Sequence, residues 1–75
     1  MDTKENINTK KVAERLKQFR MNAGMTQQEV ADYAGIDRKT VNRIENNHFS
    51  PNLDTMFRIC VALAVKPASL FDGLK

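Results

Sequence analysis

The chain has 75 residues, a length that suits one small domain and is too short for a separate catalytic or ligand-sensing unit beside it. Hydrophobic residues make up 41% and charged residues 28%, as in globular proteins, and a net charge of +3 only mildly favours a polyanionic partner. One cysteine cannot form an internal disulfide, and no apolar run suits a membrane span or a signal peptide, so we expect a cytoplasmic protein.

The first residues are mostly polar. We expect a flexible N-terminal tail over residues 1–9 and a single folded domain over residues 10–75. A basic arm that reaches around DNA is the alternative for the tail, although Asp2 and Glu5 offset Lys4.

The pattern from Lys10 to Ala23 predicts a first helix, with Thr9 as its N-cap and Gly24 as its stop. Its apolar stripe consists of Val12, Leu16, Phe19 and Ala23. Arg20 lies in the same stripe, and burying a cation without a partner would be costly. Glu45, on the inward side of a later helix, is the candidate partner; two separately solvated charges are the alternative.

The stretch from Thr26 to Glu45 predicts two short helices separated by a tight turn at Gly35, which can adopt a positive φ. Their apolar or small positions are Val30, Ala31, Ala34, Val41 and Ile44. Thr26 and Glu29 form a capping-box pattern at the start of the first helix, and Asp37 is expected to cap the second. The stretch is therefore predicted to be a helix-turn-helix.

The second of these helices separates inward residues from cationic ones. Val41, Ile44 and Glu45 share one side, and no acidic residue occurs between Arg38 and Ile44. Arg and Lys can donate to guanine O6 and N7, and Asn can pair with adenine, in the major groove of DNA. Four outward or flanking side chains are therefore predicted to read bases: Arg38, Lys39, Asn42 and Arg43. A merely solvated basic face is the alternative.

The segment from Asn46 to Asn52 is predicted to be a loop beside this helix. Backbone N–H groups at Asn46 and Asn47, and the side chain of His48, are candidates for phosphate contacts, as is the side chain of Thr40. A solvated His48 is the alternative. One His and one distant Cys make no metal site.

A fourth helix is predicted from Leu53 to about Val65, capped by Asn52. Its core stripe is expected to comprise Leu53, Met56, Ile59, Cys60 and Leu63. Cys60 fits as a small buried hydrophobe, with a reactive thiol as the alternative. Pro67 can occupy the first position of a short fifth helix through Phe71.

Several segments together resemble the lambda-repressor-like, Cro/C1 or XRE-type helix-turn-helix family: TQQEVA (26–31), GID (35–37) and TVNRIEN (40–46). The similarity extends from about Val12 to Phe71. It implies an all-α, compact five-helix DNA-binding domain with its helix-turn-helix at the second and third helices. Residues Asp37–Asn46 would then enter the major groove.

The same resemblance implies roles for individual residues. Arg20 and Glu45 would form an ion pair between the first and third helices, and Gln27 would meet a phosphate and brace a side chain of the recognition helix. The chain departs from the family pattern at Asn47 and Ala64, where Gly is common.

The resemblance also implies a homodimer on two-fold-related half-sites of operator DNA. The apolar residues left after the core is assigned predict weak dimerisation through the fourth and fifth helices: Phe57, Val61, Phe71 and Leu74. We expect a small sequence-specific transcriptional regulator, a repressor, without cofactor, metal or small-molecule ligand.

Other functions of the same fold stay open. Phage-type repressors, restriction-modification controllers and antitoxins have similar cores, and a protein-interaction module such as an antitoxin-type partner is the alternative to DNA reading. An enzyme is not expected, because the chain has one His, no Ser/His/Asp set and no Gly-rich phosphate loop.

Overall fold

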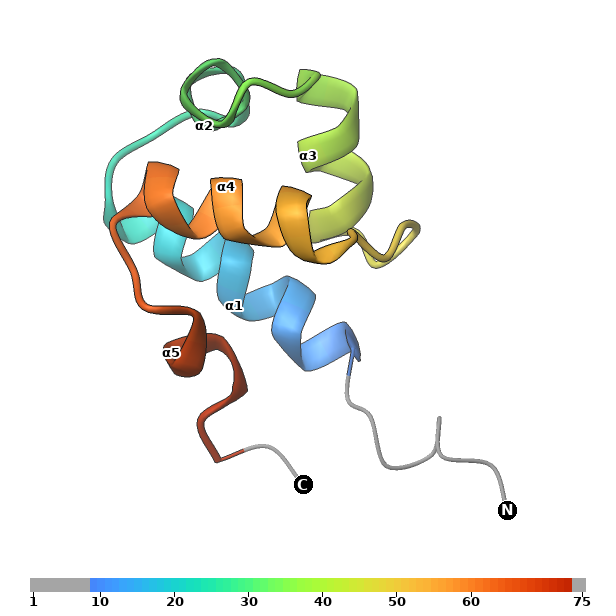
Figure 1. Cartoon of the computed structure of the whole chain (residues 1–75), viewed down its shortest axis with the longest axis vertical. Helices are drawn as coiled ribbons and strands as arrows, with labels where there is room; N and C mark the ends of the chain where they lie inside the picture. Colours follow the sequence, from blue (N-terminus) through green and yellow to red (C-terminus); the bar gives the residue numbers. More distant parts are fainter. Residues whose placement is uncertain (1–8, 74–75) are drawn as a thin grey trace.

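The computed structural model describes residues 9–73, in which the chain forms helices and no strand (Figure 1). The helices are α1 (Thr9–Asn22), α2 (Gln27–Ala34), α3 (Arg38–Glu45), α4 (Leu53–Leu63) and α5 (Pro67–Phe71). α2 packs against α3 and α4, while α1 packs against α3 and α5. Figure 1 accordingly shows α2 and α3 together at one end, with α5 at the other. The predicted all-α, five-helix architecture is confirmed.

One hydrophobic core joins all five helices. It is made of buried residues from each of them: Leu16, Val30, Ala31, Ala34, Val41, Ile44, Ile59, Cys60, Leu63 and Leu70. Ala31 is fully buried, as its small side chain allows where helices pack closely. Cys60 is buried as well, and this burial raises the pKa of its thiol. Its interpretation as a core hydrophobe therefore holds.

Leu53 was wrongly expected in this core. Its side chain is 88% exposed. It lies in the first turn of α4, before the helix reaches the buried core at Ile59, and four residues before the exposed Phe57. The apolar pattern of α4 thus contains an inward stripe and a separate outward face.

Several predicted helix ends are present. The Asn52 side chain accepts a hydrogen bond of 2.8 Å from the backbone N–H of Thr55, and Pro67 occupies the start of α5. These contacts satisfy or remove donors that the first turn of a helix leaves unpaired.

Other predicted helix ends differ. α1 already includes Thr9, so this residue is not its N-cap, and Ala23 lies exposed beyond the end of the helix. Asp37 occupies the N-cap position of α3 but makes no capping hydrogen bond through its side chain. α4 ends at Leu63 rather than near Val65, because Ala64 adopts a left-handed conformation with φ of 56°.

Some expectations concern residues outside the described range. The predicted N-terminal tail lies there except for Thr9, and so does Leu74. Within residues 9–73, no helix combines the length and the apolar character needed to cross a membrane.

Candidate nucleic-acid interface

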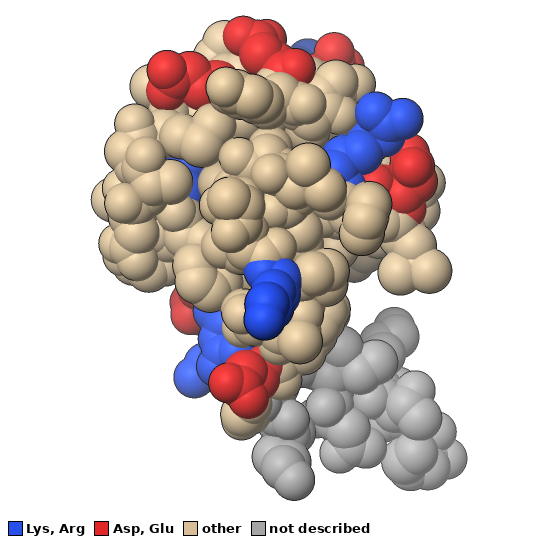
Figure 2. All heavy atoms as spheres, turned by 60° about the vertical axis from the view of Figure 1, so that its left-hand side comes forward, with Lys and Arg blue, Asp and Glu red and all other residues tan. Residues whose placement is uncertain are grey.

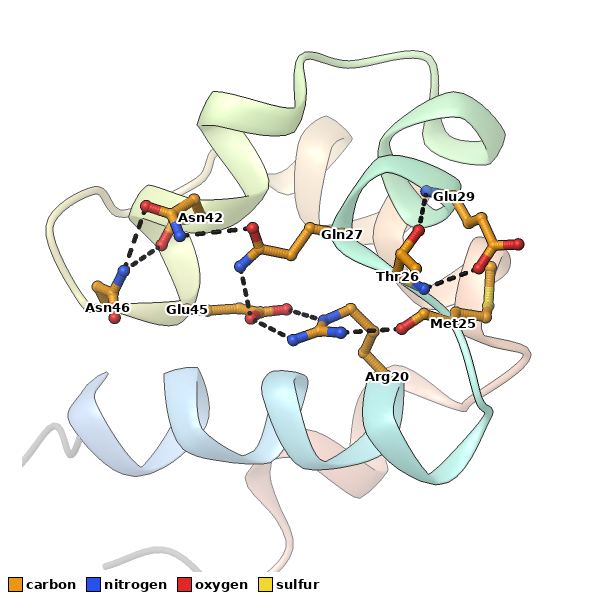
Figure 3. A network of polar contacts seen from close by, with 8 residues as sticks. All are labelled: Arg20, Met25, Thr26, Gln27, Glu29, Asn42, Glu45 and Asn46. Atoms are coloured by element: carbon orange, nitrogen blue, oxygen red, sulfur yellow. Dashed lines mark hydrogen bonds and ion pairs between the residues drawn. The ribbon is translucent and has the colours of Figure 1, made fainter.

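The helix-turn-helix begins at a complete capping box, drawn in Figure 3. The backbone N–H of Glu29 donates to Thr26 Oγ1 at 3.0 Å, and the backbone N–H of Thr26 donates to Glu29 Oε1 at 2.8 Å. At the other end of α2, Gly35 has a φ of 73° and donates its N–H to the carbonyl of Ala31. A defined start and a left-handed stop therefore fix the length of α2 and the direction in which α3 leaves it.

A buried ion pair fixes α3 against α1. Arg20 Nε donates to Glu45 Oε2 at 2.6 Å, and Arg20 Nη2 donates to Glu45 Oε1 at 3.1 Å (Figure 3). The side chains are only 13% and 4% exposed, respectively. Arg20 Nη1 also donates to the carbonyl of Met25 at 2.8 Å, just before α2. The predicted pair is thus present, and its guanidinium connects α1, α3 and the segment that leads into α2.

Gln27, the first residue of α2, lies between this ion pair and the surface of α3 (Figure 3). Its Nε2 donates to Glu45 Oε1 at 3.1 Å, and its Oε1 accepts from Asn42 Nδ2 at 3.4 Å. Asn46 Nδ2 donates in turn to Asn42 Oδ1 at 3.3 Å and to the Asn42 carbonyl at 3.0 Å. The contact between Gln27 and a recognition-helix side chain, expected from the resemblance, is therefore observed.

The outward face of α3 carries the predicted base-reading cations. Arg38, Lys39 and Arg43 are exposed, and Asn42 is half-buried by its bonds to neighbouring side chains. The guanidinium carbon of Arg43 lies 5.9 Å from the ring centroid of Phe49, a distance typical of a cation–π contact. The opposite face of α3 buries Val41, Ile44 and Glu45. This separation leaves the cations outside and uses the apolar side for attachment.

The loop after α3 does not offer the backbone donors that we expected. The N–H groups of Asn46, Asn47 and His48 donate to carbonyls of Asn42, Ile44 and Arg43, at 3.1, 3.0 and 2.8 Å. Asn47 allows this arrangement by adopting a φ of 59°, which closes the end of α3 on itself. These three residues are exposed and their backbone N–H groups are already used, so any contact that they make with a phosphate comes from their side chains. Thr40, in the first turn of α3, is half-buried.

Figure 2 shows the side of the molecule where α4 ends. Uncharged residues cover most of this view, Lys and Arg stand apart from one another, and Asp and Glu gather at the end that carries α2. Among the predicted dimer residues, Phe57, Val61 and Phe71 are 61%, 65% and 52% exposed. Leu53 extends this exposed apolar set along α4, although the sequence interpretation assigned it to the core.

A family model described as Helix-turn-helix matches residues 16–70, which include the whole α2–α3 unit. The chain belongs to the lambda-repressor-like (Cro/C1, XRE-type) helix-turn-helix family. This membership confirms the resemblance found in the sequence, and with it a role in DNA-binding transcriptional regulation.

The chain is similar in sequence to transcriptional regulators and in structure to solved restriction-modification controller proteins. It is 32% identical over 57 residues to an uncharacterized HTH-type transcriptional regulator of Archaeoglobus fulgidus, covering 76% of this chain and 81% of that protein. The restriction-modification controller C.AhdI of Aeromonas hydrophila matches with a TM-score of 0.82 and 28% identity, over 85% of this chain and 97% of that one. A variant of C.Esp1396I bound to its highest-affinity operator site matches with a TM-score of 0.78 and 29% identity, over 88% and 87% of the two chains.

Proposed function

We propose that this helix-turn-helix protein binds a specific operator in double-stranded DNA through α3, acts as a repressor by occupying that site, and binds as a homodimer. The observation that carries the proposal is the outward face of α3. Three exposed cations within six residues project from a helix whose other side is buried and ion-paired. A related controller has been solved on its operator, which supports the same use of this fold.

The proposed readout has two components. Base edges in the major groove would be read by Arg38, Lys39, Asn42 and Arg43, since guanidinium and ammonium groups donate to guanine and a carboxamide pairs with adenine. Phosphates would be held by the side chains of Gln27, Thr40, Asn46, Asn47 and His48. Phosphate contacts supply affinity and register, whereas base contacts supply sequence preference.

The proposed dimer follows from the size of the module. A single helix-turn-helix covers too little DNA for high specificity, and two-fold symmetry doubles the site that is read. Exposed apolar side chains of α4 and α5, Phe57, Val61 and Phe71, are available for a self-complementary contact. Leu74 remains part of this proposal on sequence grounds.

A binding-site selection from randomised duplex DNA tests the function directly. We expect enrichment of one palindromic sequence, with half-sites about one helical turn apart. Affinity for the selected site should fall steeply as salt rises, because phosphate contacts release counterions. If no sequence is enriched and binding to all DNA is equally weak, the proposal fails and a protein-interaction module becomes the better explanation of the basic face.

A further inference from the structure

A line of side-chain hydrogen bonds connects the buried carboxylate of Glu45 to the surface of α3 (Figure 3). A carboxylate can only accept hydrogen bonds. The Gln27 carboxamide therefore has to turn its NH₂ group toward Glu45, as it does at 3.1 Å, and its oxygen is directed the other way. The buried charge thus determines which end of Gln27 faces α3.

The orientation of Gln27 determines that of Asn42 in the same manner. The Gln27 oxygen needs a donor, and Asn42 Nδ2 supplies it at 3.4 Å. The Asn42 oxygen then lies free to accept, and Asn46 Nδ2 donates to it at 3.3 Å. Each bond donates in the direction of Glu45, an arrangement in which neighbouring bonds strengthen one another.

Asn42 retains one N–H and one oxygen lone pair after these bonds, because its NH₂ group carries two donors and its oxygen two lone pairs. A donor and an acceptor side by side match N7 and the N6 amino group of adenine in the major groove. Without an external constraint, a carboxamide can rotate by half a turn and exchange the two positions. The constraint from Gln27 removes that freedom.

We propose that Glu45, acting through Gln27, fixes the donor and acceptor ends of Asn42 and so makes the protein select adenine at the base pair that Asn42 faces. Gln27 and Glu45 are then positioning residues for sequence readout, and the ion pair with Arg20 serves specificity as well as packing. This inference rests on the proposed function, since it needs α3 in the major groove.

The test uses Gln27→Met, which keeps an unbranched side chain of similar length but removes both polar ends. Gln28→Met is the matched control. Gln28 is the next residue on α2, is exposed, and bonds Asp32 at 2.9 Å rather than the buried ion pair. Asn42→Ala removes the base contact itself, and the double variant Gln27→Met/Asn42→Ala completes a mutant cycle.

Dissociation constants are measured by fluorescence anisotropy for the selected operator and for operators with each base pair exchanged in turn. We expect Asn42→Ala to reduce discrimination at one A·T pair, and Gln27→Met to reduce it at the same pair by roughly five- to tenfold. The effect of Gln27→Met should vanish in the Asn42→Ala background, while Gln28→Met resembles the wild type. Thermal melts verify that each variant is folded. If Met disturbs packing, the test is repeated with Gln27→Ala, because alanine has the highest helix propensity.

Three outcomes overturn the inference. Gln27→Met can weaken binding to every DNA by one factor, which leaves Gln27 as a phosphate contact alone. The effect of Gln27→Met on base-pair discrimination can persist in the Asn42→Ala background, which would mean that Gln27 does not act through Asn42. The base pair at which Asn42→Ala reduces discrimination can be one other than A·T. A wild-type protein without any sequence preference is a separate result, because it refutes the proposed function before Gln27 is changed.

Discussion

The outward faces of α3 and α4 are both accessible to partners, but the first is polar and cationic whereas the second is apolar. On α3, exposed cations and a bonded carboxamide present donors and acceptors with defined directions, and a buried ion pair holds the helix in place. On α4, Leu53, Phe57 and Val61 present apolar surface without directional bonds. Reading a base requires an exact orientation, whereas apolar association mainly requires area.

The support behind the two faces differs accordingly. Arg20, Gln27 and Glu45 come from three helices and meet behind α3, so its orientation depends on the whole tertiary structure. The exposed residues of α4, Leu53, Phe57 and Val61, lie four residues apart and therefore on one face of a single helix. Substitutions behind α3 should therefore lower both the stability of the fold and the sequence preference of DNA binding. Substitutions on the exposed face of α4 should weaken dimerisation without lowering the stability of the monomer.

Replacing Glu45 by Gln should give the largest effect. It leaves the Arg20 guanidinium, 13% exposed, without its countercharge, and we expect a loss of about 3 kcal/mol in the free energy of unfolding. Urea denaturation followed by circular dichroism measures it. Asp54→Asn makes the same chemical change in the exposed pair with Arg58 and should cost less than about 1 kcal/mol. Equal losses in the two variants would mean that burial does not distinguish the pairs.

Replacing Arg43 by Ala tests the readout face of α3. Binding to the selected operator should weaken by roughly 1 to 3 kcal/mol, while binding to random duplex changes less, because a base contact is lost. Fluorescence anisotropy on both DNAs measures the difference. Lys66→Ala removes an exposed cation at the start of α5 and should alter the two affinities alike. An equal loss on both DNAs for Arg43→Ala would assign this residue to phosphate contacts.

Replacing Phe57 by Ser tests the apolar face of α4. We expect dimerisation to weaken by about 1 to 2 kcal/mol, since part of a phenyl ring is no longer removed from water, with little change in monomer stability. Sedimentation equilibrium measures the dimer constant. Tyr33→Ser is the control: this aromatic residue of α2 is 79% exposed and lies outside the proposed dimer residues. If the Tyr33 variant dissociates and the Phe57 variant does not, the dimer uses another surface.

Replacing Ala64 by Gly should give the smallest effect, and this effect should be an increase in stability. Ala64 has a φ of 56° at the end of α4, a conformation that glycine adopts without steric cost, so we expect about 1 kcal/mol of added stability. Ala62→Gly, inside the same helix, should instead lose about 1 kcal/mol. Thermal or urea unfolding compares the two. Opposite signs are required, and a loss at both positions would contradict the assigned backbone conformation.

Local features of the site could be predicted because short segments specify them. The capping box of Thr26 and Glu29 and the left-handed Gly35 depend on neighbours within a few residues. The Arg20–Glu45 pair was accessible from helical spacing, because each charge falls on the inward side of its own helix. Periodicity therefore indicated a long-range contact here.

Other features escaped prediction because they depend on what surrounds a residue. Leu53 has the side chain of a core residue, yet no other helix within residues 9–73 buries it at the start of α4. The backbone N–H groups of Asn46 and Asn47 were expected to contact phosphates, but they donate to carbonyls of α3 instead. The direction of the hydrogen bonds through Gln27 had no signal in the spacing of residues.

The amino-acid sequence alone determined five amphipathic helices, their order, the basic outward side of α3 and the family to which the chain belongs. These properties follow from side-chain spacing and from turn chemistry within a few residues. Only the tertiary structure decided which apolar residues remain exposed, and that a carboxylate from α3 faces an amide from α2 and a guanidinium from α1. Burial and hydrogen-bond direction are properties of several elements packed together, so no single segment could specify them.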